Sequence, residues 1–518
     1  MRDKWTSRSS FILAAIWSAV WLWNAWRFPW LCAEYGGWAF LIAYIICMLL
    51  LGMPLLMMEF AIWRKTQKSA PQALATLNKK SRRIGWAATG NAFFVMTFYA
   101  TVFARCILMC ISSYKFAADA WTTETASTLW QNSILATFNT SFELQGLYVN
   151  FLMLICFILA WILIYSCIKN GAKQVWKIVK YTVTLPVIML LILAVKWFIN
   201  NPHLWEALSA LFIPQFDAFY NANLWIAAMG QSFFSLSIMA GVMIVYGSFL
   251  KKDSNIFVDW LIITLSDLAV SVLSGIVLFT TMYSTGLTVE DMSASGISTA
   301  FIIYPTAIVN LTSSWIFNAI FWFIFYFMLC TLAIDSAFSM LEWVSSALSD
   351  YLRIEKKKVS QILSVIAATM GLIFITWAWV AFVDIVDNRI NQYCMIIVWI
   401  LEVILVGRFF KPKKILEEIN KNTDKYKMPK RWFIFSVKYI APIMLTILFV
   451  WQLIILIKSW FRYNSDYDLI AEIILWWWTM LLVFASWFII NAVMKRTKKW
   501  REILALDEKE PMWDEIKD

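Results

Sequence analysis

The sequence predicts an all-α membrane protein with twelve transmembrane helices, and three observations support this fold class. Of the 518 residues, 61% are hydrophobic and 15% are charged, whereas soluble domains are about 45–50% apolar and about 25% charged. Mean hydropathy is +0.68. The chain also holds about a dozen continuous apolar runs, each near the length of about 20 residues that crosses a bilayer as a helix. These observations exclude a soluble enzyme, a disordered chain and a transmembrane β-barrel.

The apolar runs define the expected helices. In chain order they cover residues 9–33, 38–63, 86–113, 147–168, 171–197, 224–250, 256–281, 317–349, 359–382, 386–410, 432–457 and 467–495. Residues 293–310 add an apolar stretch that is too interrupted to span, so we expect a re-entrant or capping segment there. Residues 1–495 are expected to form one transmembrane domain, and residues 496–518 a charged cytoplasmic tail.

Basic residues lie in the short segments on alternate sides of the expected helices. Residues 64–83 carry seven Lys and Arg and no acid, whereas residues 114–148 carry one Lys and three acids. Short cytoplasmic loops are enriched in basic residues, so 64–83 and both termini are expected in the cytoplasm. The net charge of +11 could suggest a nucleic-acid partner, but this distribution does not support one. It indicates instead a multi-pass protein of an inner or plasma membrane, surrounded by lipid.

No residue pattern indicates a metal centre or an enzyme. The eight cysteines are scattered without a CxxC pair, and the only histidine is His203. Structural metal sites need closely spaced Cys and His ligands, and an active site needs a nucleophile with its base or a cofactor loop. The sequence also carries no signal for an oligomeric state.

Two expected helices contain polar residues at mid-membrane. Ser18 and Asn24 interrupt the first, and Gln231, Ser235 and Ser237 interrupt the sixth. Each such residue could simply hydrogen-bond to its own backbone. The two interruptions lie five spans apart, however, at matching places in two halves of about 9–197 and 224–410. Broken helices at matching places in inverted repeats point to a transporter's midplane site. Residues 432–495 would then add two extra helices.

Several motifs at consistent spacing carry a family resemblance. They are Asn24 to Pro29, Ala33 to Gly37, Phe233 to Ser237, Asp335-Ser336 and Met340 to Glu342. Together they resemble the neurotransmitter:sodium symporters, in order from Arg2 to about Glu402. The resemblance implies the leucine-transporter fold and sodium-coupled uptake of a neutral, hydrophobic or aromatic amino acid by alternating access.

The resemblance implies a substrate site at the two helix breaks. Its expected residues are Ala19, Leu22, Trp23, Val95, Tyr99, Phe234, Ser235, Ser237, Ala240, Ser336 and Met340. A half-helix that begins near Leu22 would present free N–H groups and a positive dipole end to the substrate carboxylate. Tyr99 could donate its hydroxyl to the same carboxylate.

The resemblance also implies two sites for Na+, the expected coupled ion. The first takes the Ala19 carbonyl with Asn24, Ser235 and Asp267. The second takes the carbonyls of Trp17, Val20 and Leu332 with the side chains of Asp335 and Ser336. Acids inside membrane spans are costly and are functional by default, which supports an ion-binding role for Asp267 and Asp335.

Charged pairs are expected to close the two ends of the substrate path. Arg27 and Asp387 would form the extracellular gate, and Arg2 and Asp350, with Trp5 nearby, the cytoplasmic gate. The family's chloride site maps to Tyr44, Gln231, Ser235 and Ser271. Asp267, however, stands where chloride-dependent members have Asn, and two close anions repel strongly in a low dielectric. We therefore expect chloride independence and a vestigial chloride site.

The chain departs from the family in its tryptophans. The family pattern has Gly at Trp17, Trp21, Trp23, Trp38, Trp63, Trp176, Trp343 and Trp399, and the chain holds 32 Trp and only 15 Gly. A single cause is more economical than eight separate changes. We hypothesise that the source organism reads as Gly a codon translated here as Trp. Unwound backbone needs the φ freedom of Gly. Real interfacial aromatic belts are the alternative, but Trp17 to Trp23 lie mid-span.

Two other functions stay open at this point. A sodium-independent transporter of the amino acid–polyamine type would share the fold, and sodium dependence of uptake separates the two. A transport-inactive sensor or plugged homologue gains weight if the tryptophans are real, because indoles at 17, 21 and 23 would fill the pocket.

Overall fold

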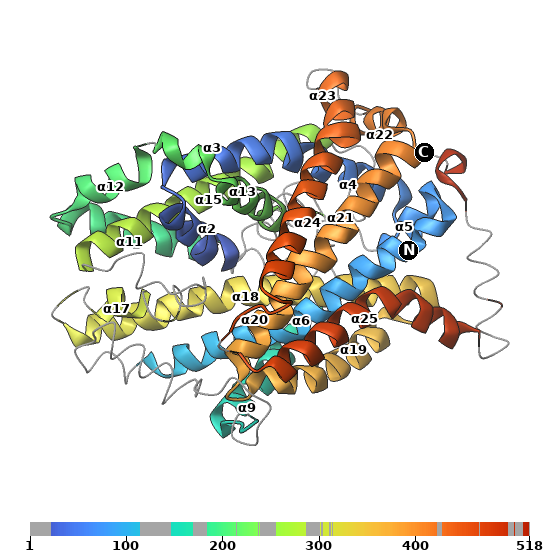
Figure 1. Cartoon of the computed structure of the whole chain (residues 1–518). Coiled ribbons are helices and arrows are strands. Elements are labelled where there is room, and N and C mark those ends of the chain that lie inside the picture. The colour runs from blue at the N-terminus through green and yellow to red at the C-terminus, as the bar shows by residue number, and fades with distance from the viewer. Residues whose placement is uncertain are drawn as a thin grey trace.

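The computed structural model describes residues 22–113, 147–168, 184–213, 215–236, 255–285, 304–309, 314–421, 427–465, 467–495 and 511–516, with a few isolated positions. These residues are almost entirely helical (Figure 1). Apart from helices and turns, they contain one isolated antiparallel bridge, between Val149 and Thr376. The expectation of an all-α fold is confirmed.

Nine helices in the described part of the chain are long and apolar enough to cross a membrane. Together with three spans that are only partly described, these nine helices match the twelve expected runs. In order they are α2 (Leu22–Glu34); α3 (Trp38–Cys47), η1 (Met48–Gly52) and α4 (Met53–Thr66); α6 (Arg82–Ile111); α9 (Phe151–Ile168); α11 (Thr184–Asn200); α13 (Ala222–Ser235); α15 (Ile256–Thr285); α18 (Trp315–Leu352); α19 (Lys356–Gly371) and η7 (Leu372–Ile375); α20 (Trp379–Arg389), η8 (Ile390–Cys394), α21 (Met395–Ile404) and η9 (Leu405–Phe409); α23 (Lys430–Phe435), η10 (Ser436–Ile440) and α24 (Ala441–Lys458); and α25 (Leu469–Met494).

Short helices connect these spans. On one side of the bundle lie α12 (Leu204–Phe212), η4 (Phe216–Tyr220) and α17 (Tyr304–Val309), and on the other α5 (Ala70–Leu77), η2 (Lys79–Ser81) and α22 (Pro412–Ile419) (Figure 1). The helix α17 packs on α18 and falls within the expected capping segment. The helix α12 was not predicted from the sequence.

The helices pack as an enclosed centre with a lipid-facing periphery. The helix α6 runs along α18, α15 packs on α2, and α13 packs on α3. The apolar stretch of α6 is 89% buried inside the protein, whereas those of α24 and α25 are only 22% and 17% buried. The helix α6 therefore forms part of the core, and α24 and α25 present most of their apolar side chains to the membrane.

The boundary between the ninth and tenth spans differs from the expectation. The sequence placed it at 383–385, next to two acids, because charges usually mark the end of a span. In the structure the helix breaks at 376–378, and α20 begins at Trp379. Asp384 and Asp387 consequently lie inside the tenth span. They are tolerated there because each accepts a hydrogen bond, from Tyr467 and Asn391 respectively, at 2.7 Å.

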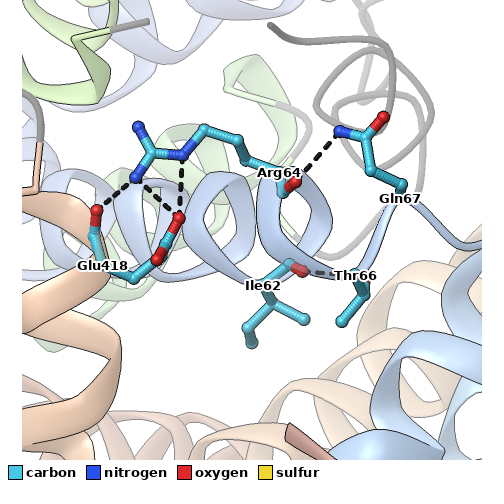
Figure 2. A network of polar contacts seen from close by, with 5 residues as sticks. All are labelled: Ile62, Arg64, Thr66, Gln67 and Glu418. Atoms are coloured by element: carbon cyan, nitrogen blue, oxygen red, sulfur yellow. Dashed lines mark hydrogen bonds and ion pairs between the residues drawn. The ribbon is translucent and has the colours of Figure 1, made fainter. Parts of the chain in front are cut away.

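A buried ion pair joins the second span to α22. Arg64, at the end of α4, donates Nε to Glu418 Oε1 at 3.1 Å and Nη2 to the same oxygen at 2.9 Å, and Nη2 also contacts the Glu418 carbonyl (Figure 2). The side chains are only 1% and 10% exposed. Nearby, Gln67 donates its amide to the Arg64 carbonyl and Thr66 its hydroxyl to the Ile62 carbonyl. This network fixes where the second span ends.

The C-terminal residues 511–516 pack beside the same region. The Lys65 ammonium lies 4.7 Å from the centre of the Trp513 ring, and Phe410 meets that ring edge-on at 5.6 Å. Lys414 on α22 donates to both oxygens of Asp514, at 2.5 Å to Oδ1. This hydrogen bond lowers the pKa of the Asp514 carboxyl below its ordinary value.

Replacing Glu418 by Gln should destabilise the fold. Removing one partner of a buried pair leaves an uncompensated charge, which costs about 3–5 kcal/mol. We expect a clearly lower melting temperature in detergent, followed through the reactivity of the buried cysteines. Glu417→Gln, one residue away and exposed, is the control and should melt like wild type. The double change Arg64→Met with Glu418→Met should recover most of the loss. Equal melting of Glu418→Gln and Glu417→Gln would contradict the role of the pair.

Candidate functional site

A buried carboxylate, Asp267 on α15, is the centre of a polar cluster that joins four helices. Oδ1 accepts the Asn24 amide at 2.7 Å, and Oδ2 accepts the Tyr44 hydroxyl at 2.9 Å and the Ser235 hydroxyl at 2.6 Å. These donors come from α2, α3 and α13, and all four side chains are fully buried. The helices are thus brought together around one negative charge.

The spacing of polar residues on α15 explains how the cluster forms. Asp267, Ser271 and Ser274 follow at intervals of four and three residues, so they share one face of the helix. Ser271 Oγ lies 2.9 Å from the Asn24 amide nitrogen, and the Ser274 hydroxyl donates to the Asn24 carbonyl at 2.6 Å. The helix α15 packs on α2, so this polar face lies against α2.

The Asn24 side chain is oriented so that its amide oxygen, Oδ1, is not used by the cluster. The amide nitrogen lies within hydrogen-bond distance of Ser235 Oγ, Asp267 and Ser271 Oγ. Its Oδ1 atom is buried and has no hydrogen-bond partner among the described residues. A buried unpaired oxygen normally costs about 1–3 kcal/mol. Beside a carboxylate and a serine hydroxyl, it can instead serve as a ligand to a hard cation.

Of the first expected sodium site, three members therefore lie together: Asn24, Ser235 and Asp267. Ala19 lies outside the described residues, as do Trp17 and Val20 of the second site. For Asp335, only the backbone is described, in α18. Ser336 is buried and donates to the Leu332 carbonyl at 3.3 Å. The second site thus stays an expectation, with three of its members, Leu332, Asp335 and Ser336, on adjoining turns of α18.

Three of the four residues expected to hold chloride lie beside Asp267 or its partner Asn24. The hydroxyls of Tyr44 and Ser235 are directed to its carboxylate, and Ser271 lies against the Asn24 amide. The Gln231 side chain is fully buried, and neither its oxygen nor its nitrogen has a partner among the described residues. Two of the four expected chloride donors, Tyr44 and Ser235, are thus engaged by the protein's own anion.

The expected substrate residues lie on α2 and α13, which meet at this cluster, and on α6 and α18, which pack on each other. Tyr99 and Val95 lie one turn apart on α6, Phe234 and Ser235 end α13, and Met340 lies on α18, which packs along α6. Leu22 and Trp23 begin α2, where only the backbone is described. Ser237 and Ala240 lie outside the described residues. The described members thus lie on different helices, and their common substrate site stays a prediction.

Of the expected outer gate, Arg27 lines a cavity between α2, α13, the tenth span and α24, whereas Asp387 does not. Arg27 stacks its guanidinium 4.9 Å above the Phe234 ring and is attracted by the Asp387 carboxylate. The cavity, about 340 Å³, is lined by both Arg27 and Phe234, by Asn391 and Trp399 of the tenth span, and by Trp451 of α24. At the opposite end, Asp350 accepts the Ser69 backbone N–H at 3.1 Å. Arg2 and Trp5 lie outside the described residues.

Some charged residues near the site were missed from the sequence. Arg105, inside α6, is 1% exposed and stacks 3.6 Å from the centre of the Trp379 ring. Asp384 accepts the Tyr467 hydroxyl, and Arg389 lies 4.4 Å from the centre of the Trp476 ring. Charges within apolar runs are a sequence signal that could have drawn attention to all three.

Four of the eight unusual tryptophans can be placed. Trp63, Trp343 and Trp399 are at most 1% exposed, and their indole N–H groups have no acceptor in the described part of the chain. Trp86 and Trp260 share this property, so the unpaired N–H groups alone do not single out the unusual positions. Trp399 stacks on Phe233 at 4.4 Å and lines the cavity, and Trp38 tilts against Phe212 at 5.8 Å. The others lie where no side chain is described.

Comparisons with known proteins agree on one family. The family model described as "Sodium:neurotransmitter symporter family" matches residues 2–127 and 115–498. An uncharacterized sodium-dependent transporter of Methanocaldococcus jannaschii is 30% identical over 486 residues, or 92% of this chain and 95% of the relative. The sodium- and chloride-dependent GABA transporter 2 of Rattus norvegicus is 26% identical, over 81% and 75%. The crystal structure of MhsT in complex with L-phenylalanine superposes with a TM-score of 0.74 at 25% identity, over 87% of this chain and 99% of that one.

Peptide mass spectrometry on protein from the source organism should find Gly at 17, 21, 23 and 399. Residue 399 is informative because its side chain stacks on Phe233 and lines the cavity, which Gly would enlarge. Trp26, where the family carries Trp, should stay Trp and serves as the internal control. Trp at all the unusual positions would contradict the recoding hypothesis and favour the plugged homologue.

Proposed function

Because the chain belongs to the sodium:neurotransmitter symporter family, we propose that it carries a neutral, hydrophobic or aromatic amino acid into the cell together with sodium. Membership makes it a multi-pass, sodium-dependent membrane transporter and not an enzyme. The amino acid is proposed from MhsT, whose structure holds L-phenylalanine. Residues 1–495 would form the transporting domain, with both termini in the cytoplasm.

The observation that carries the proposal is the Asn24–Ser235–Asp267 cluster. It offers the buried, unpaired Asn24 Oδ1 next to a carboxylate, at the end of α13 where the sixth span stops being helical. An ion bound there would hold α2, α13 and α15 in one arrangement. A bound ligand favours a conformation only through its higher affinity for it. Sodium would therefore stabilise the closed arrangement that retains the substrate.

The substrate would lie between the broken ends of the first and sixth spans. Tyr99 on α6 and Phe234 on α13 would contact it, with Val95 and Met340 beside the side chain. Arg27 and Asp387 would close over it from outside and Arg2 and Asp350 from inside. Exposed ion pairs contribute only about 0–1 kcal/mol, so such gates can open and close readily.

A sodium gradient alone should drive uptake. We expect proteoliposomes to accumulate L-phenylalanine with sodium outside and to lose accumulation when potassium replaces it. For this experiment the gene should encode, at the eight unusual tryptophan positions, the residues that mass spectrometry identifies. Asn24→Leu should abolish accumulation, because it removes a proposed ligand, whereas Asn491→Leu, on α25 and outside the cavity lining, should not. Equal uptake in sodium and potassium would favour the amino acid–polyamine type of transporter.

Chloride independence is the second part of the proposal. The relative from Rattus norvegicus is named as chloride-dependent, whereas Asp267 already places an anion among Tyr44, Ser235 and Ser271 in this chain. A chloride 4 Å from the carboxylate would be repelled by about 4 kcal/mol at an effective dielectric constant of about 20. The fixed carboxylate would supply the negative charge for the sodium site.

Asp267→Asn should create a chloride requirement. Uptake by wild type is expected to be unchanged when gluconate replaces chloride. In Asp267→Asn the site lacks its negative charge, so uptake in gluconate should fall about tenfold or more and recover with chloride, a change of at least about 1.4 kcal/mol. Asp217→Asn, at an exposed position, is the control. Collapse of wild-type uptake in gluconate would overturn the proposal.

A further inference from the structure

The helix that carries the outer gate acid is tied to a distant loop. Asp387 lies on α20, and Asp384 lies one turn before it on the same helix. Asp384 Oδ2 accepts the hydroxyl of Tyr467 at 2.7 Å. Tyr467 belongs to the connection between α24 and α25, about 80 residues further along the chain, and α25 packs on α20.

The two carboxylates have separate donors. Asn391 donates its amide to Asp387 Oδ1 at 2.7 Å, and Tyr467 is the only hydrogen-bond donor that the described residues offer Asp384. Asp387 is attracted by Arg27 and repelled by Asp384. Asp384 therefore lies one helical turn from the acid that interacts with Arg27. If it lost the Tyr467 hydroxyl, the Asp384 carboxylate would be free to turn toward that pair and compete for Arg27.

The loop that presents Tyr467 is itself fixed. The backbone N–H groups of Tyr463 and Asn464 donate to the two oxygens of Glu472, at 2.9 and 3.1 Å, and thereby join the loop to the first turn of α25. Arg462 donates to the Tyr467 carbonyl at 2.5 Å. The hydroxyl is thus held at a defined place beside α20.

We propose that Tyr467 is a positioning residue of the outer gate: its hydroxyl holds Asp384 aside so that Arg27 pairs with Asp387. Nothing in the comparisons assigns a role to this residue. The proposal rests on the proposed gate between Arg27 and Asp387. It gives the eleventh and twelfth spans, which lie outside the two repeats, a part in retaining the substrate.

The test measures how fast bound L-[3H]phenylalanine leaves the purified protein in saturating sodium. Tyr467→Phe frees the Asp384 carboxylate, so dissociation should quicken by about three- to tenfold, the range for one lost hydrogen bond. Asp384→Asn removes the competing charge. Asp384→Asn alone should have little effect on the dissociation rate. Combined with Tyr467→Phe, it should restore the slow dissociation of wild type. Tyr439→Phe, the same change at an exposed position, is the control.

The outcomes separate this inference from the proposed function. A loop that merely unfolds would reduce the amount of binding-competent protein without changing its rate constant, and Asp384→Asn would not suppress the defect. An unchanged rate in Tyr467→Phe, or no suppression, overturns the positioning role. Arg27→Gln and Asp387→Asn are measured alongside. If neither quickens dissociation, or if sodium promotes no binding of L-phenylalanine, the proposed gate or function itself fails.

Discussion

A carboxylate can be kept inside a membrane protein only if its charge is met by donors or by a cation, because an isolated charge there is very costly. Asp267 meets this requirement through Asn24, Tyr44 and Ser235, each from a different helix. The cost of leaving Asp267 unsatisfied thus fixes how α2, α3, α13 and α15 approach one another. The proposed ion site and the proposed vestigial chloride site both depend on that approach.

The rest of the molecule supports this centre from outside. The helix α6, which carries Tyr99, runs along α18 through the most enclosed part of the bundle. The Arg64–Glu418 pair joins the end of the second span to α22 (Figure 2). The start of the tenth span is joined to the loop before α25 by Tyr467, and to α25 by Arg389, which lies over the Trp476 ring. Contacts with helices outside the two expected repeats therefore hold the ends of these two spans.

The sequence predicted the fold because apolar runs locate the spans. The centre of the site, with Asn24, Ser235 and Asp267, was implied by the family resemblance that the short motifs carry. The sequence misplaced the start of the tenth span because Asp384 and Asp387 look like a boundary until Tyr467 and Asn391 are seen beside them. Arg105 was missed for the same reason, since its partner ring, Trp379, lies far along the chain. Pairings over such separations depend on tertiary packing, which one sequence does not display.

The central claim is that the Asp267 carboxylate serves one sodium ion and excludes chloride. It is tested most directly by a crystal structure obtained with L-phenylalanine in sodium bromide, with anomalous scattering used to locate bromide. The account predicts a cation bound by Asn24 Oδ1 and Asp267, and no anomalous peak among Tyr44, Gln231 and Ser271. A bromide peak there, or a cluster that holds no cation when substrate is bound, would contradict it.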